Sequence, residues 1–194
     1  MTARIERVSS AEINTWIVGD DDEVIVIDPG GDPAGMLDAV GDREVLAVIC
    51  THGHPDRAAD ALEVAERDEA PVALHPQDRP AWRDAPPEID MADGGIFETA
   101  GVRLEVIHAP GHTGGSVCLY CEDLDVVFTG HAMAAIGPVR HDGEFPDFAS
   151  QLTAIGEYLL TLPGRTRVLP GEGEETTIAA AEKQFDSWVT AGPS

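Results

Sequence analysis

Residues 45–57 read VLAVICTHGHPDR, an apolar run that ends in a short loop with two histidines and an aspartate. The apolar part, Val45 to Cys50, is typical of a buried strand. Behind the loop, Ala58 to Arg67 has the spacing of an amphipathic helix. Functional residues often lie on the loop that follows a strand, so this junction is the first candidate for a site.

Strands and helices alternate along the rest of the chain. Apolar runs predict further strands at Ile13 to Val18, Val24 to Asp28, Pro71 to His75, Val102 to His108, Ser116 to Cys121, Asp125 to Thr129 and Arg167 to Leu169. Helical spacing predicts a short helix from Ala34 and longer helices over Phe148 to Leu160 and Ile178 to Val189. Residues 76–95 are rich in Pro, Asp, Gly and Arg and predict loops with at most a helical turn. The alternation indicates a layered α/β protein, and its recurrence in both halves fits two sheets back to back.

Composition sets the broad class of the protein. With 194 residues, 43% of them hydrophobic, we expect one domain over residues 1–194 and no separate substrate domain. The first seven residues carry charges where a signal peptide is apolar, and no apolar run is long enough to span a membrane, so we expect a cytoplasmic protein with no membrane partner. A net charge of −24 repels phosphate backbones, so we expect no nucleic-acid partner.

The three cysteines do not indicate a disulfide framework or a redox motif. Cys50, Cys118 and Cys121 are too few and odd in number for disulfides. Cys118 and Cys121 form a C-x-x-C pattern, but it lies in a predicted strand, where positions three apart face opposite sides. We therefore expect no shared metal or redox site there.

The histidine pattern points to a metal. His52 and His54 can converge on one cation as neutral nitrogen ligands, with Gly53 between them to allow an unusual backbone angle. His112 is the natural third ligand, because it lies in a second glycine-rich loop, residues 109–116, between two predicted strands. Three histidines leave a fourth position open for water, an arrangement that lowers the pKa of water on zinc toward about 7.

These loops resemble those of a known family. Thr51 to Asp56 and Pro110 to Ser116 look like the two metal loops of the metallo-β-lactamase superfamily. Three further segments resemble its other motifs in the same order: Val24 to Gly30, Val127 to Gly130 and Leu169 to Gly173. The resemblance implies an α/β fold of four layers, an αβ/βα sandwich, with a metal cleft along one edge of the sheets. Within the superfamily the chain is most similar to glyoxalase II-like (hydroxyacylglutathione hydrolase-like) thioester hydrolases.

Carried over residue by residue, the resemblance implies a first metal site of His52, His54 and His112, expected to hold one firmly bound zinc ion. Asp56 matches a ligand of the second site. A carboxylate beside a dication is ionised and can orient metal-bound water or take its proton, so Asp56 is also the expected catalytic residue.

Three positions depart from the family pattern at that second site. Arg57 replaces a histidine ligand and cannot bind a cation, although it could hold Asp56 or, like Ser116, contact substrate. His131 replaces an aspartate that bridges the two metals, and Glu172 replaces the last histidine. Asp56, His131 and Glu172 could still form an altered second site for zinc, manganese or iron.

The remaining candidates are weaker. We expect His75, His108 and His141 to be structural or surface residues. Trp82 and the segment from Met133 to Phe145 are placed to line a cleft, although such residues more often pack in a core.

The resulting functional hypothesis is metal-dependent hydrolysis of a thioester or a related acyl or ester compound, with a small acyl-thiol as substrate. The printed chain ends soon after the last metal loop, so we expect a thiol carrier other than glutathione. Two alternatives remain: an oxidoreductase similar to the mononuclear iron persulfide dioxygenases, and a catalytically decayed member that only binds. A β-lactamase is less favoured, because such enzymes meet their substrates outside the cytoplasm.

Overall fold

Two six-stranded sheets lie back to back in the computed structural model, which describes residues 2–10, 13–54, 58–82, 87–140 and 146–193. In spatial order the first sheet consists of β1 (Arg4–Ser10), β2 (Ile13–Gly19), β3 (Glu23–Ile27), β4 (Glu44–Ile49), β5 (Val72–Leu74) and β6 (Ile89–Asp90). The second consists of β12 (Thr176–Thr177), β11 (Arg167–Pro170), β10 (Val126–Gly130), β9 (Val117–Cys121), β8 (Val102–His108) and β7 (Ile96–Thr99). Each sheet mixes parallel and antiparallel pairs.

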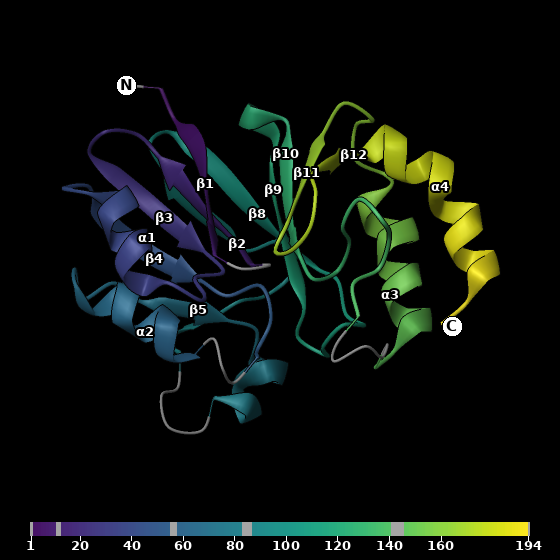
Figure 1. Cartoon of the computed structure of the whole chain (residues 1–194), viewed down its shortest axis with the longest axis horizontal. Helices are drawn as coiled ribbons and strands as arrows, with labels where there is room; N and C mark the ends of the chain where they lie inside the picture. The colour runs from purple at the N-terminus through teal and green to yellow at the C-terminus, as the bar shows by residue number, and fades with distance from the viewer. Residues whose placement is uncertain (1, 11–12, 55–57, 83–86, 141–145, 194) are drawn as a thin grey trace.

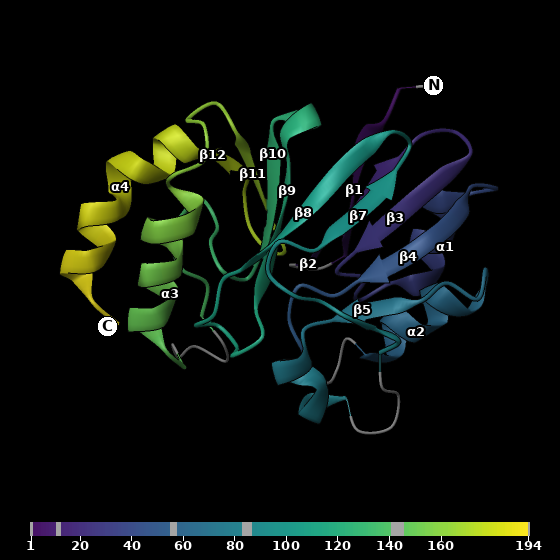
Figure 2. The same cartoon turned by 180° about the vertical axis from the view of Figure 1, so that it is seen from behind.

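Helices cover the outer face of each sheet (Figure 1), and Figure 2 shows the same layers from behind. The first sheet is covered by α1 (Pro33–Val40) and α2 (Ala58–Glu66), and the second by α3 (Phe148–Ala154), the π-helical turn η4 (Ile155–Leu159) and α4 (Ile178–Ala191). Two short 3₁₀ turns, η2 (Pro76–Ala81) and η3 (Glu122–Leu124), complete the described elements. The predicted four-layer sandwich is confirmed. In the described residues no helix is both long and apolar enough to cross a membrane.

Alternation along the strands creates the layers. In β3, Ile25 and Ile27 face the core between the sheets, whereas Val24 and Val26 face α1 and α2. Trp16 of β2 meets Phe128 of β10 edge to face across that inner core, with ring centroids 6.0 Å apart. Strands buried on both faces explain why the sequence shows them as unbroken apolar runs.

The same alternation separates the two cysteines of the C-x-x-C pattern. Cys121 packs in the core between the sheets, and Cys118 packs on the opposite face, under α3 and α4. Both are buried free thiols, and burial raises the pKa of each. The expectation that they face opposite sides is confirmed.

Four strands were not predicted, and one predicted helix changes its form. The edge strand β1 has three charged residues, two serines and only two apolar residues, and it pairs along its whole length with β2, while β6, β7 and β12 are short. The helix expected over Phe148 to Leu160 widens into the π turn at its carboxyl end, where Ile155 and Leu159 are both fully buried.

One edge of the two sheets gathers the loops that follow β4, β8, β10 and β11. The last of these loops is held by the first sheet: Trp16 Nε1 donates a hydrogen bond of 3.0 Å to the Pro170 carbonyl. Asn14 Nδ2 donates to the same carbonyl at 3.1 Å and to the Gly173 carbonyl at 2.9 Å. The loop that carries Glu172 is therefore fixed by the amino-terminal strands.

Candidate metal centre

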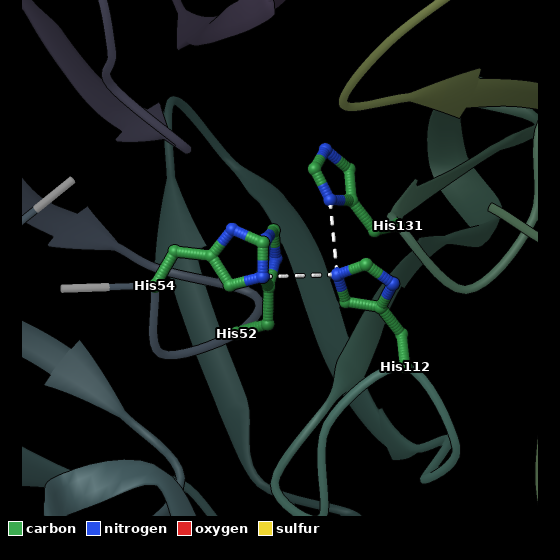
Figure 3. A group of neighbouring side chains, drawn as sticks. All are labelled: His52, His54, His112 and His131. Carbon is green, nitrogen blue, oxygen red and sulfur yellow. Dashed lines mark hydrogen bonds between the residues drawn. The ribbon is translucent and has the colours of Figure 1, made fainter. Parts of the chain in front are cut away.

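Four histidines converge at this edge. His52, His54, His112 and His131 each offer one ring nitrogen, and these four atoms all lie within 4.8 Å of one another. Figure 3 shows the rings pointing toward a common centre from three separate loops. His54 is half-buried, and the other three are buried. The three predicted ligands of the first site are thus brought together, and His131 joins them.

The spacing of the ring nitrogens fits a cation. His112 Nε2 lies 3.1 Å from His54 Nε2 and 3.1 Å from His131 Nδ1. Two nitrogens bound at about 2.0–2.1 Å to one tetrahedral ion are about 3.3 Å apart. Neutral imidazole is a good ligand for zinc, copper, iron and nickel. The donor set and its spacing therefore suit a single transition-metal ion.

A buried relay fixes the tautomer of His52. The Asp28 carboxylate accepts hydrogen bonds of 2.7 Å from both the backbone N–H and the hydroxyl of Thr51. Because that hydroxyl donates its proton to Asp28, its oxygen accepts from His52 Nδ1, which lies 3.0 Å away. The proton of neutral His52 is therefore on Nδ1, and Nε2 is the nitrogen directed to the centre.

His112 is oriented in a similar way by the segment that follows β10. Its Nδ1 lies 3.2 Å from the Val139 carbonyl, which can only accept, so Nε2 is left for a cation. The fully buried Gln151 of α3 holds that segment in place. Its Nε2 lies 3.0–3.1 Å from the carbonyl oxygens of His131, Ala132 and Val139.

Glycine at the end of β10 brings His131 into the group. Gly130 has a φ of 49°, and a Cβ at this position would lie 2.0 Å from the Thr51 hydroxyl oxygen. Only glycine combines this backbone conformation with so close an approach. The resulting turn places His131 beside His112.

Asp78 in η2 connects the two histidine loops, and sequence reasoning missed it. Its buried carboxylate accepts hydrogen bonds from Gly53 N at 2.8 Å, Gly115 N at 2.9 Å and the Thr113 hydroxyl at 2.6 Å. A Cβ on Gly53 or Gly115 would come within 2.6 Å of Asp78. The explanation of Gly53 by an unusual backbone angle is therefore wrong: its φ is not positive, and the need for glycine comes from this close contact.

The residues predicted for the second site are only partly described. Asp56 and Arg57 lie outside the described residues, as does His141. His131 lies between the other three histidines and Glu172. Its Nδ1 faces His112, and its Nε2 lies 3.8 Å from Glu172 Oε2. Glu172 is a neighbour of the group through His131, and its assignment as a ligand stays a prediction.

Ser116 braces its own loop. Its side chain is buried, accepts a hydrogen bond of 2.9 Å from Thr113 N and lies 2.8 Å from the Thr113 hydroxyl. In this structure Ser116 therefore contacts its own loop, and its role in substrate binding stays a prediction.

The other candidates separate into packing and lining roles. His75 and His108 stack on each other outside the group, with ring centroids 4.3 Å apart, and burial together with the charge of His108 lowers the pKa of His75. Trp82 packs in the core beneath α2. The prediction that the segment from Met133 to Phe145 lines a cleft is confirmed for residues 134–136 and 138–140, which line a hollow together with residues 172–174. Met133 itself packs in the core, and residues 141–145 lie outside the described residues.

Comparison with known proteins gives consistent matches. The model of the metallo-beta-lactamase superfamily matches residues 11–184. A probable metallo-hydrolase, YqgX from Bacillus subtilis, is 30% identical over 91% of this chain and 92% of its own length. The hydroxyacylglutathione hydrolase GloC from Haemophilus influenzae is 26% identical over 94% of this chain and 96% of its own.

Solved structures agree with this. The B3 metallo-beta-lactamase BLEG-1 superposes with a TM-score of 0.83 at 26% identity, covering 93% of this chain and 97% of that one. ETHE1 from Myxococcus xanthus gives a TM-score of 0.78 at 25% identity, covering 95% of this chain and 83% of that one.

Proposed function

This chain belongs to the metallo-β-lactamase superfamily, and from that premise we propose that it is a metal-dependent hydrolase of thioesters or related acyl esters. The observation that carries the proposal is the group of four histidine nitrogens within 4.8 Å of one another at the loop edge of the sheets. When bound there, a divalent metal would supply Lewis acidity, which polarises a carbonyl group and lowers the pKa of water. The histidines would hold it, and the Asp28–Thr51 pair, Val139 and Asp78 keep them oriented.

The similarity to GloC supports a thioester as substrate, because that relative is named as a hydroxyacylglutathione hydrolase. The charge of −24 supports a small molecule and argues against nucleic acid. We propose that Asp56 orients the attacking water or takes its proton, because a carboxylate that lies two residues after His54 in the sequence can act in this way.

The fourth histidine bears on which metal is bound. A tetrahedral ion held by four imidazoles has no position left for substrate, whereas catalytic zinc sites keep one open. We therefore propose zinc on His52, His54 and His112, with His131 as a further ligand only in a centre of higher coordination number. Iron suits imidazole as well.

The ability of imidazole to bind iron allows a second candidate function, an iron-dependent oxidoreductase similar to the persulfide dioxygenases. The structural similarity to ETHE1 is the observation that favours it, whereas His131 stands where that family has an aspartate ligand and counts against it. Metal content after expression in medium supplied with both zinc and iron separates the two, because iron in the active fraction would contradict the zinc hydrolase.

The proposal is tested by replacing His112 with alanine. We expect His112→Ala to lose at least about tenfold in zinc affinity and nearly all thioester turnover, because it removes a ligand that contacts two others. His75→Asn is the matched control: it removes an imidazole outside the group and keeps a side chain that can cap η2. Undiminished turnover in His112→Ala would overturn the assignment. Failure of the wild-type protein to take up zinc, iron or manganese would favour the decayed member.

A further inference from the structure

A hollow of about 360 Å³ adjoins the histidine group. The segment 134–140 forms one wall, and the loop 172–174 forms the other. Each wall includes a residue that lies beside one of the histidines: the Val139 carbonyl lies 3.2 Å from His112 Nδ1, and Glu172 Oε2 lies 3.8 Å from His131 Nε2. A substrate whose reacting carbonyl lies at the histidines could extend one of its arms into this hollow.

The chemistry of the lining selects the arm. The wall from Ala134 to Val139 presents two alanines, an isoleucine, a proline and a valine. The charged side chains of the lining are Arg140, Glu172 and Glu174, with a formal sum of −1. An apolar floor under a slightly negative rim favours an uncharged aliphatic group and gives no advantage to a carboxylate.

Ile136 is held out toward solvent by the backbone. It is 86% exposed, more than any other large hydrophobic side chain among the described residues. Ala134 and Gly137 exchange two backbone hydrogen bonds of 2.9 and 3.0 Å, so Ala135 and Ile136 form the tip of a tight turn. Gly137 has a φ of 118°, and a Cβ there would lie 3.1 Å from the Trp188 ring. This turn is braced against α4, so the side chain of Ile136 is positioned before any ligand arrives.

We propose that this hollow binds the acyl chain of the substrate, and that the substrates are thioesters of short, uncharged aliphatic acids. This inference rests on the proposed function and adds its specificity. The volume lies near the lower end of the range for ligand pockets, which suits a chain of a few carbons. Each methylene that enters should improve binding about fourfold.

The test measures turnover and binding separately. Turnover is followed with a series of acyl thioesters from acetyl to octanoyl, together with succinyl and glutaryl thioesters. Binding is measured by calorimetry with non-hydrolysable S-alkyl N-acetylcysteamine thioethers from ethyl to octyl. For wild type we expect KM and the thioether Kd to fall about fourfold per methylene until the hollow is full, with kcat little changed.

Ile136→Asp is the decisive variant. Because the Ile136 side chain is exposed, we expect this change to leave the fold intact. We expect it to raise KM for the longer chains about tenfold and to leave the acetyl substrate nearly unchanged, whereas Ile136→Leu should behave like wild type. Ile96→Asp makes the same change at an exposed isoleucine on β7, away from the hollow, and should have no effect.

The two proposals fail in different ways. Graded thioether binding without turnover of any thioester would overturn the hydrolase proposal and leave the acyl hollow standing. Turnover without chain-length dependence would overturn the hollow alone, as would an Ile136→Asp variant that keeps the wild-type dependence. A preference for succinyl over the neutral acyl group of equal length would also overturn it.

Discussion

Replacing Asp78 with alanine tests whether this residue joins the two histidine loops. The change removes the acceptor for Gly53 N, Gly115 N and the Thr113 hydroxyl. Thr113 keeps its contact with Ser116, so two buried N–H groups lose their partner. At about 1–3 kcal/mol for each, the free energy of unfolding should fall by roughly 2–6 kcal/mol, a large part of a typical total of about 5–15 kcal/mol.

The same substitution should weaken metal binding about 10- to 100-fold, because the histidine loops lose their common support. Urea unfolding followed by circular dichroism gives the stability, and competition with a chromophoric chelator gives the zinc affinity. Asp78→Asn should lose less stability than Asp78→Ala, because the amide keeps one acceptor oxygen where alanine keeps none.

Asp90→Ala is the control for Asp78→Ala. It removes an aspartate from the same region, but Asp90 is exposed and pairs with Arg79 at the surface, so less than about 1 kcal/mol should be lost. If Asp78→Ala unfolds like this control and binds zinc like wild type, Asp78 does not support the loops and the reasoning is wrong.

Two further predictions concern the relay to His52 and the cap of α3. Thr51→Val keeps the shape of the side chain and removes the acceptor for His52 Nδ1, so it should weaken zinc binding at least about tenfold. Thr51→Ser keeps the hydroxyl and should bind zinc like wild type. Equal affinities in both variants would contradict the tautomer argument. Asp147 caps α3, and hydrogen bonds from the Ser150 N–H and hydroxyl hold the pKa of Asp147 below its ordinary value of 3.8. Its contribution to stability should therefore be fully present above that value and be lost as the pH falls through the lowered pKa, so thermal melts should show the difference between wild type and Asp147→Ala shrinking only in acid.

The inner strands were predictable because they are buried on both faces. Val24 to Ile27 and Val45 to Cys50 are unbroken apolar runs that end at polar loop residues, and this pattern has few other structural readings. The edge strand β1 was not predictable in the same way. Its charged residues reflect an exposed edge, where apolar residues would invite unwanted pairing.

The candidate site divides along similar lines. His52, His54 and His112 lie in short glycine-containing loops, so local sequence was enough to propose them. The position of His131 depends on the close approach of Gly130, in the second sheet, to Thr51, which follows a strand of the first sheet. The sequence near His131 does not indicate this contact. Asp78 lies in a proline-rich stretch without periodicity, and its role arises only when both loops fold over it.

The hydrogen bonds of Asn14 also indicate that the centre forms only after most of the chain has been synthesised. Asn14 binds carbonyl groups that the ribosome adds 156 and 159 residues later, and His54 meets His112 only after 58 further residues have been made. An ion that bound the first loop early would have to close that long stretch of unfolded chain, at a cost in entropy that nothing yet offsets. We therefore expect a metal ion to bind this centre only after the two sheets have brought the histidine loops together, and its binding then stabilises the folded chain.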